Sequence, residues 1–448
     1  MERVTRIAFL SEHASPVALL GGEDAGGQNV YVDEVSRNLG QLGYAVDVFT
    51  RRDNPGAPEV IEWAPNVRII NLMAGPVIFM PKDELWQFMP AFRDALLDFI
   101  ERDETRYDLL HSNFWMSGWV ATELQNRLNI PAVHIFHAMG KTKQKHQGSA
   151  DTSPQERIDV ESQIIRSVER VIAQCPSECS ELVNDYGADP KRVVIIPSAV
   201  NTTVFHPVTR EEARQRIGLA QNAFVVVYIG RMLPRKDVRN VVRGMAELVR
   251  YCESQTAHYS TPFPPLHLLL VGGETTEPDP LATPEIGVLQ QLVKELGISE
   301  YVTFVGKRQQ DVLHTYYSVG DVAVTTPWYE PFGLTPLEGM ACGRPVIGSA
   351  VGGITYTIAD EETGFLVPPR DPKALAERLY QLLIEPERRV RMGHAARVRV
   401  EREFTWEIVA RRTSVLYEAV LSMHKSATQT LFTPLLATRE SQSMREGE

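Results

Sequence analysis

Two glutamates flank a glycine turn in the stretch WYEPFGLTPLEGMACGRPVI, which spans residues 328–347. Glu330 precedes the turn and Glu338 follows it. The whole stretch comes directly after the apolar run DVAVTTP of residues 321–327. Carboxylate oxygens at the end of a strand can accept hydrogen bonds from the hydroxyl groups of a ligand. This stretch is therefore the first candidate for a ligand-binding site.

The residues between the two glutamates predict both a helix start and an anion site. Thr335 suits the N-cap, Pro336 the first helical position and Glu338 the third, so the pattern resembles a capping box. The amides left free at such a start belong to Phe332, Gly333, Leu334 and Thr335. Together with the helix dipole they would hold a phosphate, while Glu338 accepts hydrogen bonds from a ribose and Glu330 reaches the group that the phosphate carries. Capping and ligand binding stay open as alternatives for Glu338.

A basic turn follows another apolar run, FVVVYIG, in the sequence GRMLPRKD of residues 230–237. Arg231 and Lys236 would neutralise a diphosphate there, since both side chains carry hydrogen-bonding positive charge. The alternative is a solvated basic turn without a ligand.

Two further strand ends carry polar or permissive residues. Gly26 and Gly27 precede a helical pattern and would let the backbone approach a ligand closely, although a tight turn explains them equally well. They do not form the G-x-G-x-x-G pattern of NAD-binding proteins. His137 ends the run AVHIFHA and would bind a sugar hydroxyl, although a lone histidine is more often structural.

Apolar, β-branched runs alternate with amphipathic segments along most of the chain. The runs are RIAFLS (6–11), AVDVFT (45–50), VRIINL (67–72), DLLHS (108–112), AVHIFHA (132–138), VVIIPS (193–198), FVVVYIG (224–230), LHLLLVGG (266–273), VTFVGK (302–307), DVAVTTP (321–327) and PVIGSA (345–350). Continuous apolar strands between helices indicate parallel sheets covered on both faces. Helices are predicted over residues 83–102 and 284–297, and a surface loop over 256–266.

The polar stretch at residues 201–218 divides the strands into two sets. We therefore predict an α/β fold with two Rossmann-like domains, residues 1–205 and 206–405, facing each other across a cleft at the carboxyl ends of both sheets. A C-terminal helix is expected over residues 406–425, packed back toward the N-terminal domain, followed by a mobile tail over 426–448.

Composition excludes several classes of protein. The net charge of −11 argues against a nucleic-acid binder, which needs a concentrated basic face. No apolar run approaches the ~18–20 residues of a membrane span, and no signal peptide is apparent. Four cysteines are too few for a disulfide framework, which favours the cytoplasm. No metal-binding cluster is apparent, and Cys175 and Cys179 lack partners at zinc-site spacing.

These motifs in combination resemble the retaining glycosyltransferase family 4, which has the two-Rossmann GT-B fold. The resemblance rests on E-x7-E at residues 330–338, GRMLPRKD, VGGETTEPDP, residues 343–372 and the N-terminal DAGGQNVYV, and it covers residues 5 to about 422. It implies that Glu330 contacts the donor sugar, Glu338 the ribose, Arg231 and Lys236 the diphosphate, and His137 the transferred sugar. The Gly26–Gly27 loop would lie against the diphosphate and the reaction centre.

The resemblance also implies a mechanism. No Asp/Glu pair of the glycosidase kind stands out, so we expect front-face transfer with retention of configuration, in which the leaving phosphate helps to deprotonate the acceptor. Neither a metal nor another cofactor would be required.

Two branches of the family compete for the substrates. DAGGQ, LPRKD and EPFGLT resemble sucrose-phosphate and sucrose synthases, which use UDP-glucose; sucrose-phosphate synthases transfer to fructose 6-phosphate. GQNVYV, MPKDEL and HSNFWMSG resemble inositol-phosphate N-acetylglucosaminyltransferases, but Phe114 and Ala138 lack the hydroxyls that bind the acceptor phosphate there. Candidate acceptor ligands in either branch are Gln28, Lys82, Lys141, Lys143 and Arg157.

The sucrose-phosphate synthase branch is therefore the favoured interpretation. A non-catalytic nucleotide-sugar-binding protein of the same fold is the alternative from another class. One further departure concerns PSAVNTTVF, where Ala199 and Asn201 replace the Gly and Asp that the family usually carries. This departure weakens any role for that loop but leaves the donor site unaffected.

Overall fold

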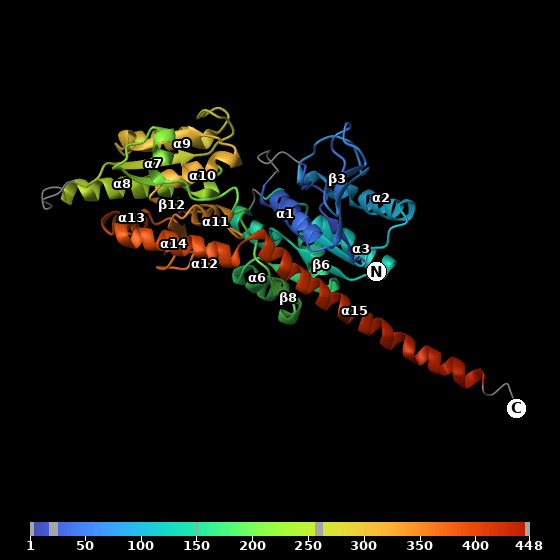
Figure 1. Ribbon diagram of the computed structural model, residues 1–448. Coiled ribbons are helices and arrows are strands. Elements are labelled where there is room, and N and C mark those ends of the chain that lie inside the picture. Colours follow the sequence, from blue (N-terminus) through green and yellow to red (C-terminus); the bar gives the residue numbers. More distant parts are fainter. Residues whose placement is uncertain (1–3, 18–25, 149–150, 256–262, 444–448) are drawn as a thin grey trace. The chain divides into compact units, whose positions relative to one another are not determined.

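The computed structural model describes residues 4–17, 26–148, 151–255 and 263–443. Contacts divide the chain into two compact units. The first unit contains Met1–Gln174, Cys179–Ile196 and Glu407–Glu448, and the second contains Cys175–Glu178 and Pro197–Trp406. Each unit is an α/β structure around a parallel sheet, which confirms the predicted fold class of two Rossmann-like halves (Figure 1).

The described residues of the first unit form an eight-stranded sheet in the order β3-β4-β2-β1-β5-β6-β7-β8. Its strands are β1 (Arg6–Leu10), β2 (Ala45–Arg51), β3 (Val60–Ala64), β4 (Val67–Leu72), β5 (Leu109–Asn113), β6 (Ala132–Ile135), β7 (Arg170–Ala173) and β8 (Val193–Ile195). Only β3 is antiparallel to its neighbour in this described sheet. Its helices are α1 (Gly27–Gln41), α2 (Met89–Arg102), α3 (Phe114–Leu128), α4 (Gly140–Gln147) and α5 (Arg157–Ser167), with short turns η1 (Lys82–Glu84), η2 (Trp86–Phe88) and η4 (Pro190–Arg192).

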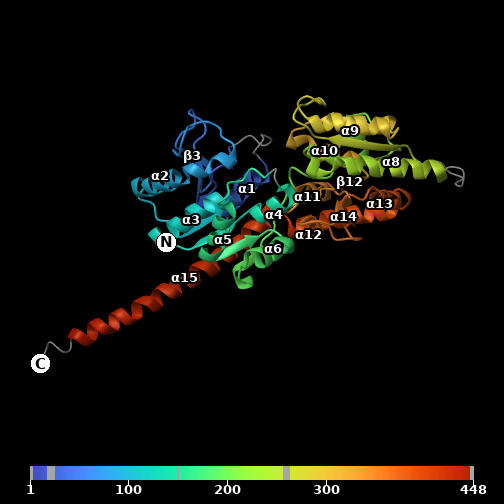
Figure 2. The ribbon, with the colours of Figure 1, turned by 180° about the vertical axis from the view of Figure 1, so that it is seen from behind.

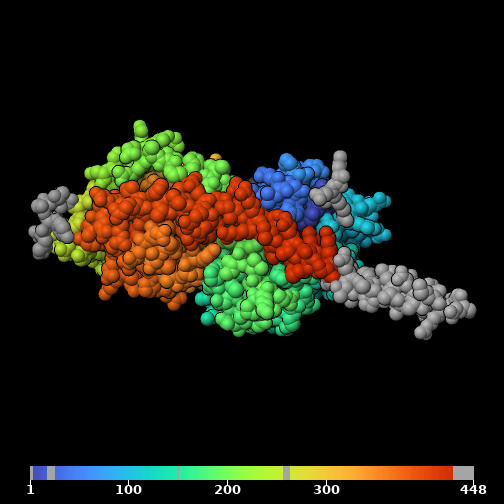
Figure 3. Space-filling view, turned by 60° about the horizontal axis from the view of Figure 1, so that its bottom comes forward, coloured from blue at the N-terminus to red at the C-terminus, as the bar shows by residue number. Residues whose placement is uncertain are grey.

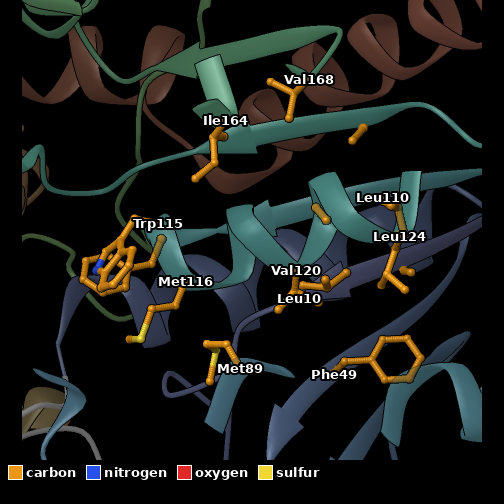
Figure 4. Packing of buried hydrophobic residues seen from close by; sticks show 14 of the residues in the cluster. Leu10, Phe49, Met89, Leu110, Trp115, Met116, Val120, Leu124, Ile164 and Val168 are labelled. Atoms are coloured by element: carbon orange, nitrogen blue, oxygen red, sulfur yellow. The ribbon is translucent and has the colours of Figure 1, made fainter. Parts of the chain in front are cut away.

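The core of the first unit lies where α2, α3 and α5 pack on the sheet. Figure 4 shows Val120 and Leu124 of α3 among Leu10 of β1 and Leu110 of β5, all completely buried. The apolar spacing of α3 directs one stripe of the helix at the strands, so burial of these side chains fixes the place where β5 ends and α3 begins. That junction holds Asn113 and Phe114.

The described residues of the second unit form a six-stranded parallel sheet in the order β11-β10-β9-β12-β13-β14. Its strands are β9 (Phe224–Ile229), β10 (Leu266–Val271), β11 (Val302–Gly306), β12 (Val322–Thr325), β13 (Val346–Ser349) and β14 (Gly364–Val367). Its helices are α7 (Arg210–Ile217), α8 (Val238–Gln255), α9 (Pro284–Glu295), α10 (Gln310–Val319), α11 (Leu334–Ala341), α12 (Ile354–Thr357), α13 (Pro372–Ile384) and α14 (Pro386–Glu403), with turns η5 (Pro234–Lys236) and η6 (Ser299–Tyr301).

Both faces of the second sheet are covered by helices (Figures 1 and 2). Val226 of β9 belongs to a buried cluster with residues of α8, α9 and α13, whereas Val225 and Val227 belong to a cluster with residues of α7, α11 and α14. Because alternate side chains of a strand point to opposite faces, a strand buried on both sides must be apolar throughout. This requirement explains the continuous run FVVVYI.

The remaining helices are α6 (Pro176–Tyr186) and α15 (Trp406–Ser443). Within the first unit, α15 lies along the sheet, where Tyr417 contacts His111 and Ser414 contacts Tyr44. In Figure 3 its red surface passes between the blue and green surfaces of the early and late parts of that unit. The helix continues beyond residue 425, where we expected it to end, to Ser443. The predicted mobility of the tail stays a prediction, and residues 444–448 lie outside the described part.

The sequence analysis missed the strands β3, β7 and β14, which are edge or near-edge strands of four or five residues and lack a long apolar run. It also expected a helix over residues 83–102, but the regular helix α2 begins only at Met89, after two short 3-10 turns. Residues 256–262 of the expected surface loop lie outside the described residues. No helix in the described part of the chain combines the length and apolar character of a transmembrane span.

Candidate active site

The strand order of the second sheet brings together the basic turn that follows β9 and the glutamate turn that follows β12. From β9 the chain proceeds to β10 and β11 on one side, and β12 then pairs with β9 on the other, so β9 and β12 form the topological switch point. Ligands of open α/β sheets bind outside the carboxyl ends of strands at such a point. Lys236 follows β9 and Glu330 follows β12, and their side chains form an ion pair.

This ion pair is largely shielded from water, with each side chain only 16% exposed. Burial lowers the pKa of Lys236, and the negative charge of Glu330 opposes that effect. Burial alone would raise the pKa of Glu330, but the charges of Lys236, Arg235 and Arg231 outweigh it and hold the pKa below its usual value. Glu330 is therefore a carboxylate at neutral pH, surrounded by three cations.

Glu338 lies in the same cluster but is held differently. Its carboxylate accepts a hydrogen bond of 2.8 Å from the hydroxyl of Tyr317 on α10. Burial raises the pKa of Glu338, and the Tyr317 hydrogen bond and the charge of Lys236 act in the opposite direction. We define the donor cluster as Arg231, Lys236, Glu330 and Glu338; the structure brings these four predicted residues together in one unit.

The expected capping box at Thr335 is wrong. Helix α11 begins at Leu334 with Gly333 as its N-cap, so Thr335 already lies in the first turn. Gly333 has a φ of 93°, a left-handed conformation that residues other than glycine rarely adopt, and this conformation starts the helix two residues early. Glu338 bonds to Tyr317 and does not close the helix start. The predicted contact of Glu338 with a ribose stays a prediction.

The start of α11 keeps the features of an anion site. No side chain of the described residues caps it. Phe332 is buried and packs in the core, so its role is to anchor the turn. The loop after β13 supports the turn from below, because the amide of Gly353 donates to the carbonyl of Glu330 at 3.1 Å. A Cβ atom on Gly352 would lie 2.1 Å from that same oxygen, so only glycine fits there.

The family resemblance implies that Glu338 binds the ribose of a nucleotide-sugar donor, and on this basis we expect Tyr317→Phe to raise the KM for the donor about fivefold with little change in kcat. The substitution removes one hydrogen bond to a charged group, and a contact made equally in the ground and transition states affects KM alone. Steady-state kinetics with varied donor would measure the change. Tyr316→Phe is the matched control, since the hydroxyl of Tyr316 accepts only from Arg308 among the described residues. A fall in kcat without a change in KM would contradict this assignment.

The first sheet has its own switch point between β1 and β5. His13 follows β1, Asn113 is the last residue of β5, and Phe114 begins α3. His137 follows β6, the strand next to β5. Nε2 of His137 lies 3.0 Å from Oδ1 of Asn113, and the ring of Tyr31 on α1 packs edge-on against it with centroids 4.9 Å apart. The structure therefore positions His137 firmly at the carboxyl edge of the sheet.

Burial keeps the histidines of this region uncharged. It lowers the pKa of His137 to about 3, assisted by the nearby His13, and lowers that of His111 to about 3, assisted by His137. His134 is shifted in the same direction for the same reason. At neutral pH His137 can therefore exchange hydrogen bonds with a ligand but does not supply a positive charge.

The depressed values predict acid sensitivity of folding. Between pH 6.5 and about 3 the unfolded chain binds protons that the folded protein excludes, so stability is complete above pH 6.5 and falls as the pH drops, by up to ~1.4 kcal/mol per pH unit for each histidine. Thermal midpoints at pH 7 and pH 5 would measure the fall. We expect a smaller fall for His111→Gln and an unchanged one for the exposed His394→Gln. An equal fall in all three proteins would contradict the assignment.

Of the predicted acceptor residues, Lys143 and Arg157 lie together. Nζ of Lys143 and Nη1 of Arg157 both donate to Oγ of Ser153, at 2.9 and 3.1 Å. Lys143 also pairs with Asp151 at 3.0 Å and with Asp83 at 3.7 Å. Lys82 precedes Asp83 in η1, and its predicted role in the acceptor site stays a prediction. We call Lys143, Ser153 and Arg157 the basic cluster.

Arg157 connects the basic cluster to the backbone of Ala138, the residue after His137. Its Nη2 donates to the carbonyl of Ala138 at 2.6 Å, and its guanidinium lies over the ring of Phe114 at 5.1 Å. Arg157 is 2% exposed and also pairs with the fully buried Glu161, whose carboxylate accepts from the amide of Gly140. The first turn of α4 is therefore tied to Arg157.

Lys141 does not join this cluster. Its ammonium donates to the carbonyl of Asp185 and lies over the ring of Tyr186 at 4.6 Å. Lys141 and Lys143 both lie in the helix α4. The helix forms because Glu161 caps Gly140 and the following residues are good helix formers. Residues 141 and 143 therefore point in different directions.

Gly26 and Gly27 lie at the start of α1 and are exposed. A Cβ atom on Gly26 would meet no described atom within 4 Å, so packing within the described residues does not require glycine there. Gln28 in the first turn donates to Oγ of Ser11 at 3.3 Å, close to the end of β1. The roles predicted for these residues stay predictions.

The unusual loop at residues 197–205 is well formed. Oδ1 of Asn201 accepts from the amides of Thr203 and Val204 at 3.0 and 3.3 Å, which is the turn geometry that aspartate also makes. Ala199 is 1% exposed, so its methyl group fills a buried space. The replacements therefore leave this turn intact.

Asn113, Tyr317 and Ser153 contact predicted site residues, and the sequence analysis did not single them out. Asn113 ends a strand, a position that signals proximity to a ligand in open α/β sheets. Tyr317 and Ser153 lie in a helix and a loop distant in sequence from Glu338 and Lys143. No local pattern in the sequence identifies such partners.

Comparison with known proteins places the chain in a family. Residues 25–204 match the family described as Glycosyltransferase Family 4, and residues 209–399 match Glycosyl transferases group 1. The D-inositol 3-phosphate glycosyltransferases of Corynebacterium efficiens and Kineococcus radiotolerans are 34% and 35% identical, and each match covers 92% of this chain and 95% of the relative. The solved sucrose-phosphate synthase of Thermosynechococcus elongatus is 35% identical with a TM-score of 0.80, covering 94% of this chain and all of that chain. The chain therefore belongs to the family 4 glycosyltransferases with the GT-B fold.

Proposed function

We propose that this glycosyltransferase transfers glucose from UDP-glucose, with retention of configuration, to fructose 6-phosphate, giving sucrose 6-phosphate. The observation that carries the phosphorylated acceptor is the basic cluster, where Lys143 and Arg157 meet at Ser153. Hydrogen bonds to Glu161, Ser153 and the carbonyl of Ala138 hold the guanidinium of Arg157 in one orientation beside Lys143. A phosphate would replace Asp151 and Asp83 as the partner of Lys143.

The choice of fructose 6-phosphate depends on Phe114 and Ala138. Both lie beside Arg157, and neither offers a hydroxyl to a phosphate. The similarity to the sucrose-phosphate synthase of Thermosynechococcus elongatus supports the same choice. The second candidate is N-acetylglucosaminyl transfer to an inositol phosphate, and the similarity to D-inositol 3-phosphate glycosyltransferases supports an inositol phosphate as its acceptor.

The donor cluster would act on the leaving group. As the glycosidic bond stretches, negative charge grows on the diphosphate, and Arg231, Lys236 and the start of α11 stabilise that charge. Glu330 orients the sugar and supports its developing positive charge, while Glu338 binds the ribose. The leaving phosphate takes the proton of the acceptor hydroxyl, so the reaction needs no carboxylate base and no metal cofactor.

The test is UDP release from UDP-glucose with and without fructose 6-phosphate, in parallel with UDP-N-acetylglucosamine and inositol phosphate. We expect release that depends on fructose 6-phosphate. Release only with the inositol phosphate pair would establish the second candidate. Binding of UDP without release in any pair would favour the non-catalytic alternative and overturn the proposal.

Lys143→Ala should raise the KM for the phosphorylated acceptor at least tenfold and leave the KM for the donor unchanged. The substitution removes one charged hydrogen-bond donor to a phosphate. Lys191→Ala is the matched control, an exposed lysine of η4 in the same unit. Equal acceptor KM values for the two variants would contradict the acceptor role of the basic cluster.

A further inference from the structure

Both polar atoms of the Asn113 side-chain amide have partners. Its Nδ2 donates to the carbonyl of Leu10 at 3.2 Å, and its Oδ1 lies 3.0 Å from Nε2 of His137. Because Leu10 offers only an acceptor, the amide nitrogen must face Leu10 and the oxygen must face the imidazole. The oxygen can only accept, so Nε2 of His137 carries the hydrogen.

Asn113 does not make the helix-capping hydrogen bond that is usual at its position. It is the N-cap residue of α3, where asparagine commonly accepts a hydrogen bond from an amide of the first turn. Its side chain makes no such cap and is completely buried, linking Leu10 at the end of β1 to His137, two residues after β6. Local helix capping therefore does not explain this residue.

His137 is held in a single orientation. Its φ of 60° is left-handed, and the edge-on contact with Tyr31 fixes the plane of its ring. With the hydrogen on Nε2, a neutral imidazole presents Nδ1 as an acceptor. Within the described part of the chain no residue hydrogen-bonds this Nδ1, and the side chain is partly exposed.

We propose that Asn113 is a positioning residue that fixes His137 as the Nε2–H tautomer, so that Nδ1 accepts a hydrogen bond from a hydroxyl of the transferred sugar. The proposal rests on the proposed function for the contact between His137 and the sugar, but not for the tautomer. The proposal predicts a preference among donor sugars. A donor sugar that lacks this hydroxyl leaves Nδ1 without a partner and reacts more slowly.

The tautomer can be observed directly in the full-length protein. Histidine side chains labelled with ¹⁵N give different shifts for protonated and unprotonated ring nitrogens, and His137→Gln identifies the signals of residue 137. We expect a protonated Nε2 and an unprotonated Nδ1 from pH 6 to pH 8 in the wild type. A mixture of tautomers, or the opposite tautomer, in the wild-type protein would overturn the proposal, so this test needs no variant of Asn113.

Two substitutions test the role of Asn113. In Asn113→Ala the fixed acceptor is lost, so the signals should become those of a tautomer mixture and kcat/KM should fall roughly tenfold. In Asn113→Asp a carboxylate faces the imidazole and favours its charged form. Activity should then rise with pH between 6 and 8, where the wild type is flat. Ser112→Ala is the matched control, because Ser112 is the buried neighbour in β5 and bonds His134 instead, at 2.8 Å.

The readouts separate this inference from the proposed function. Unchanged His137 signals in Asn113→Ala would overturn the positioning role, whatever the activity. Changed signals with unchanged transfer would confirm that Asn113 fixes the tautomer and remove His137 from the sugar site. An equal loss of activity in Ser112→Ala, with circular dichroism unchanged, would reduce Asn113 to a general packing role.

Discussion

Replacing Glu330 with glutamine should slow transfer by about 10²–10³-fold while nucleotide binding survives. The substitution keeps the size of the side chain but removes the charge that supports the electron-poor sugar in the transition state, and one such preorganised group contributes about this much to kcat. In the proposed mechanism Lys236, Arg231 and the start of α11 hold the diphosphate, and the substitution leaves them in place. In addition, Glu330→Gln frees Lys236 from its ion pair, so the lysine is more available to phosphate oxygens.

The measurement for Glu330→Gln combines single-turnover transfer with calorimetric titration of UDP. Glu362→Gln is the matched control, an exposed glutamate of the same unit. We expect a dissociation constant for UDP equal to or below that of the wild type. A tenfold weaker affinity for UDP with nearly normal transfer would reverse the roles assigned to Glu330 and Lys236.

Lys236→Ala should reduce both nucleotide affinity and the rate of transfer, with kcat/KM falling about 10³-fold. The lysine is proposed to contact the diphosphate before and during bond cleavage, so its loss affects binding and the transition state together. It also leaves Glu330 as a poorly solvated carboxylate beside the phosphate site, which repels the donor. Lys294→Ala, in α9 of the same unit, controls for the loss of one positive charge.

A double-mutant cycle separates these two effects. If repulsion from Glu330 contributes, Lys236→Ala combined with Glu330→Gln should bind UDP more tightly than Lys236→Ala alone. Equal affinities would mean that Lys236 acts only through direct contact with the diphosphate. An affinity of Lys236→Ala equal to that of the wild type would contradict the assignment of Lys236 to the diphosphate.

Much of the fold and of the donor cluster is readable from the sequence because the relevant information is local. FVVVYI and DVAVT are apolar on both faces, and strands of this kind occur in covered parallel sheets. The residues after each strand lie at one edge of the sheet, so Lys236 and Glu330 could be expected near each other although 94 positions separate them. The pairing order that makes them neighbours is a property of the whole sheet.

The errors arose where non-local contacts decide the structure. Thr335 has the residue type of an N-cap, but the left-handed Gly333 starts the helix earlier, and Tyr317 on α10 takes Glu338. Lys141 and Lys143 look equivalent in KTKQK, yet α4 turns one toward Asp185 and the other toward Ser153. Asn113 escaped notice because its partners, Leu10 and His137, come from two other strands.

The contact between Gly352–Gly353 and Glu330 has a consequence for engineering. The loop after β13 and the turn after β12 touch through backbone atoms, with no side chain between them that could be trimmed. Libraries that vary either segment alone will be rich in misfolded members, because any larger residue at 352 displaces the carbonyl of Glu330. A change of donor preference is therefore more accessible by exchanging residues 328–353 as one cassette between family members than by stepwise substitution.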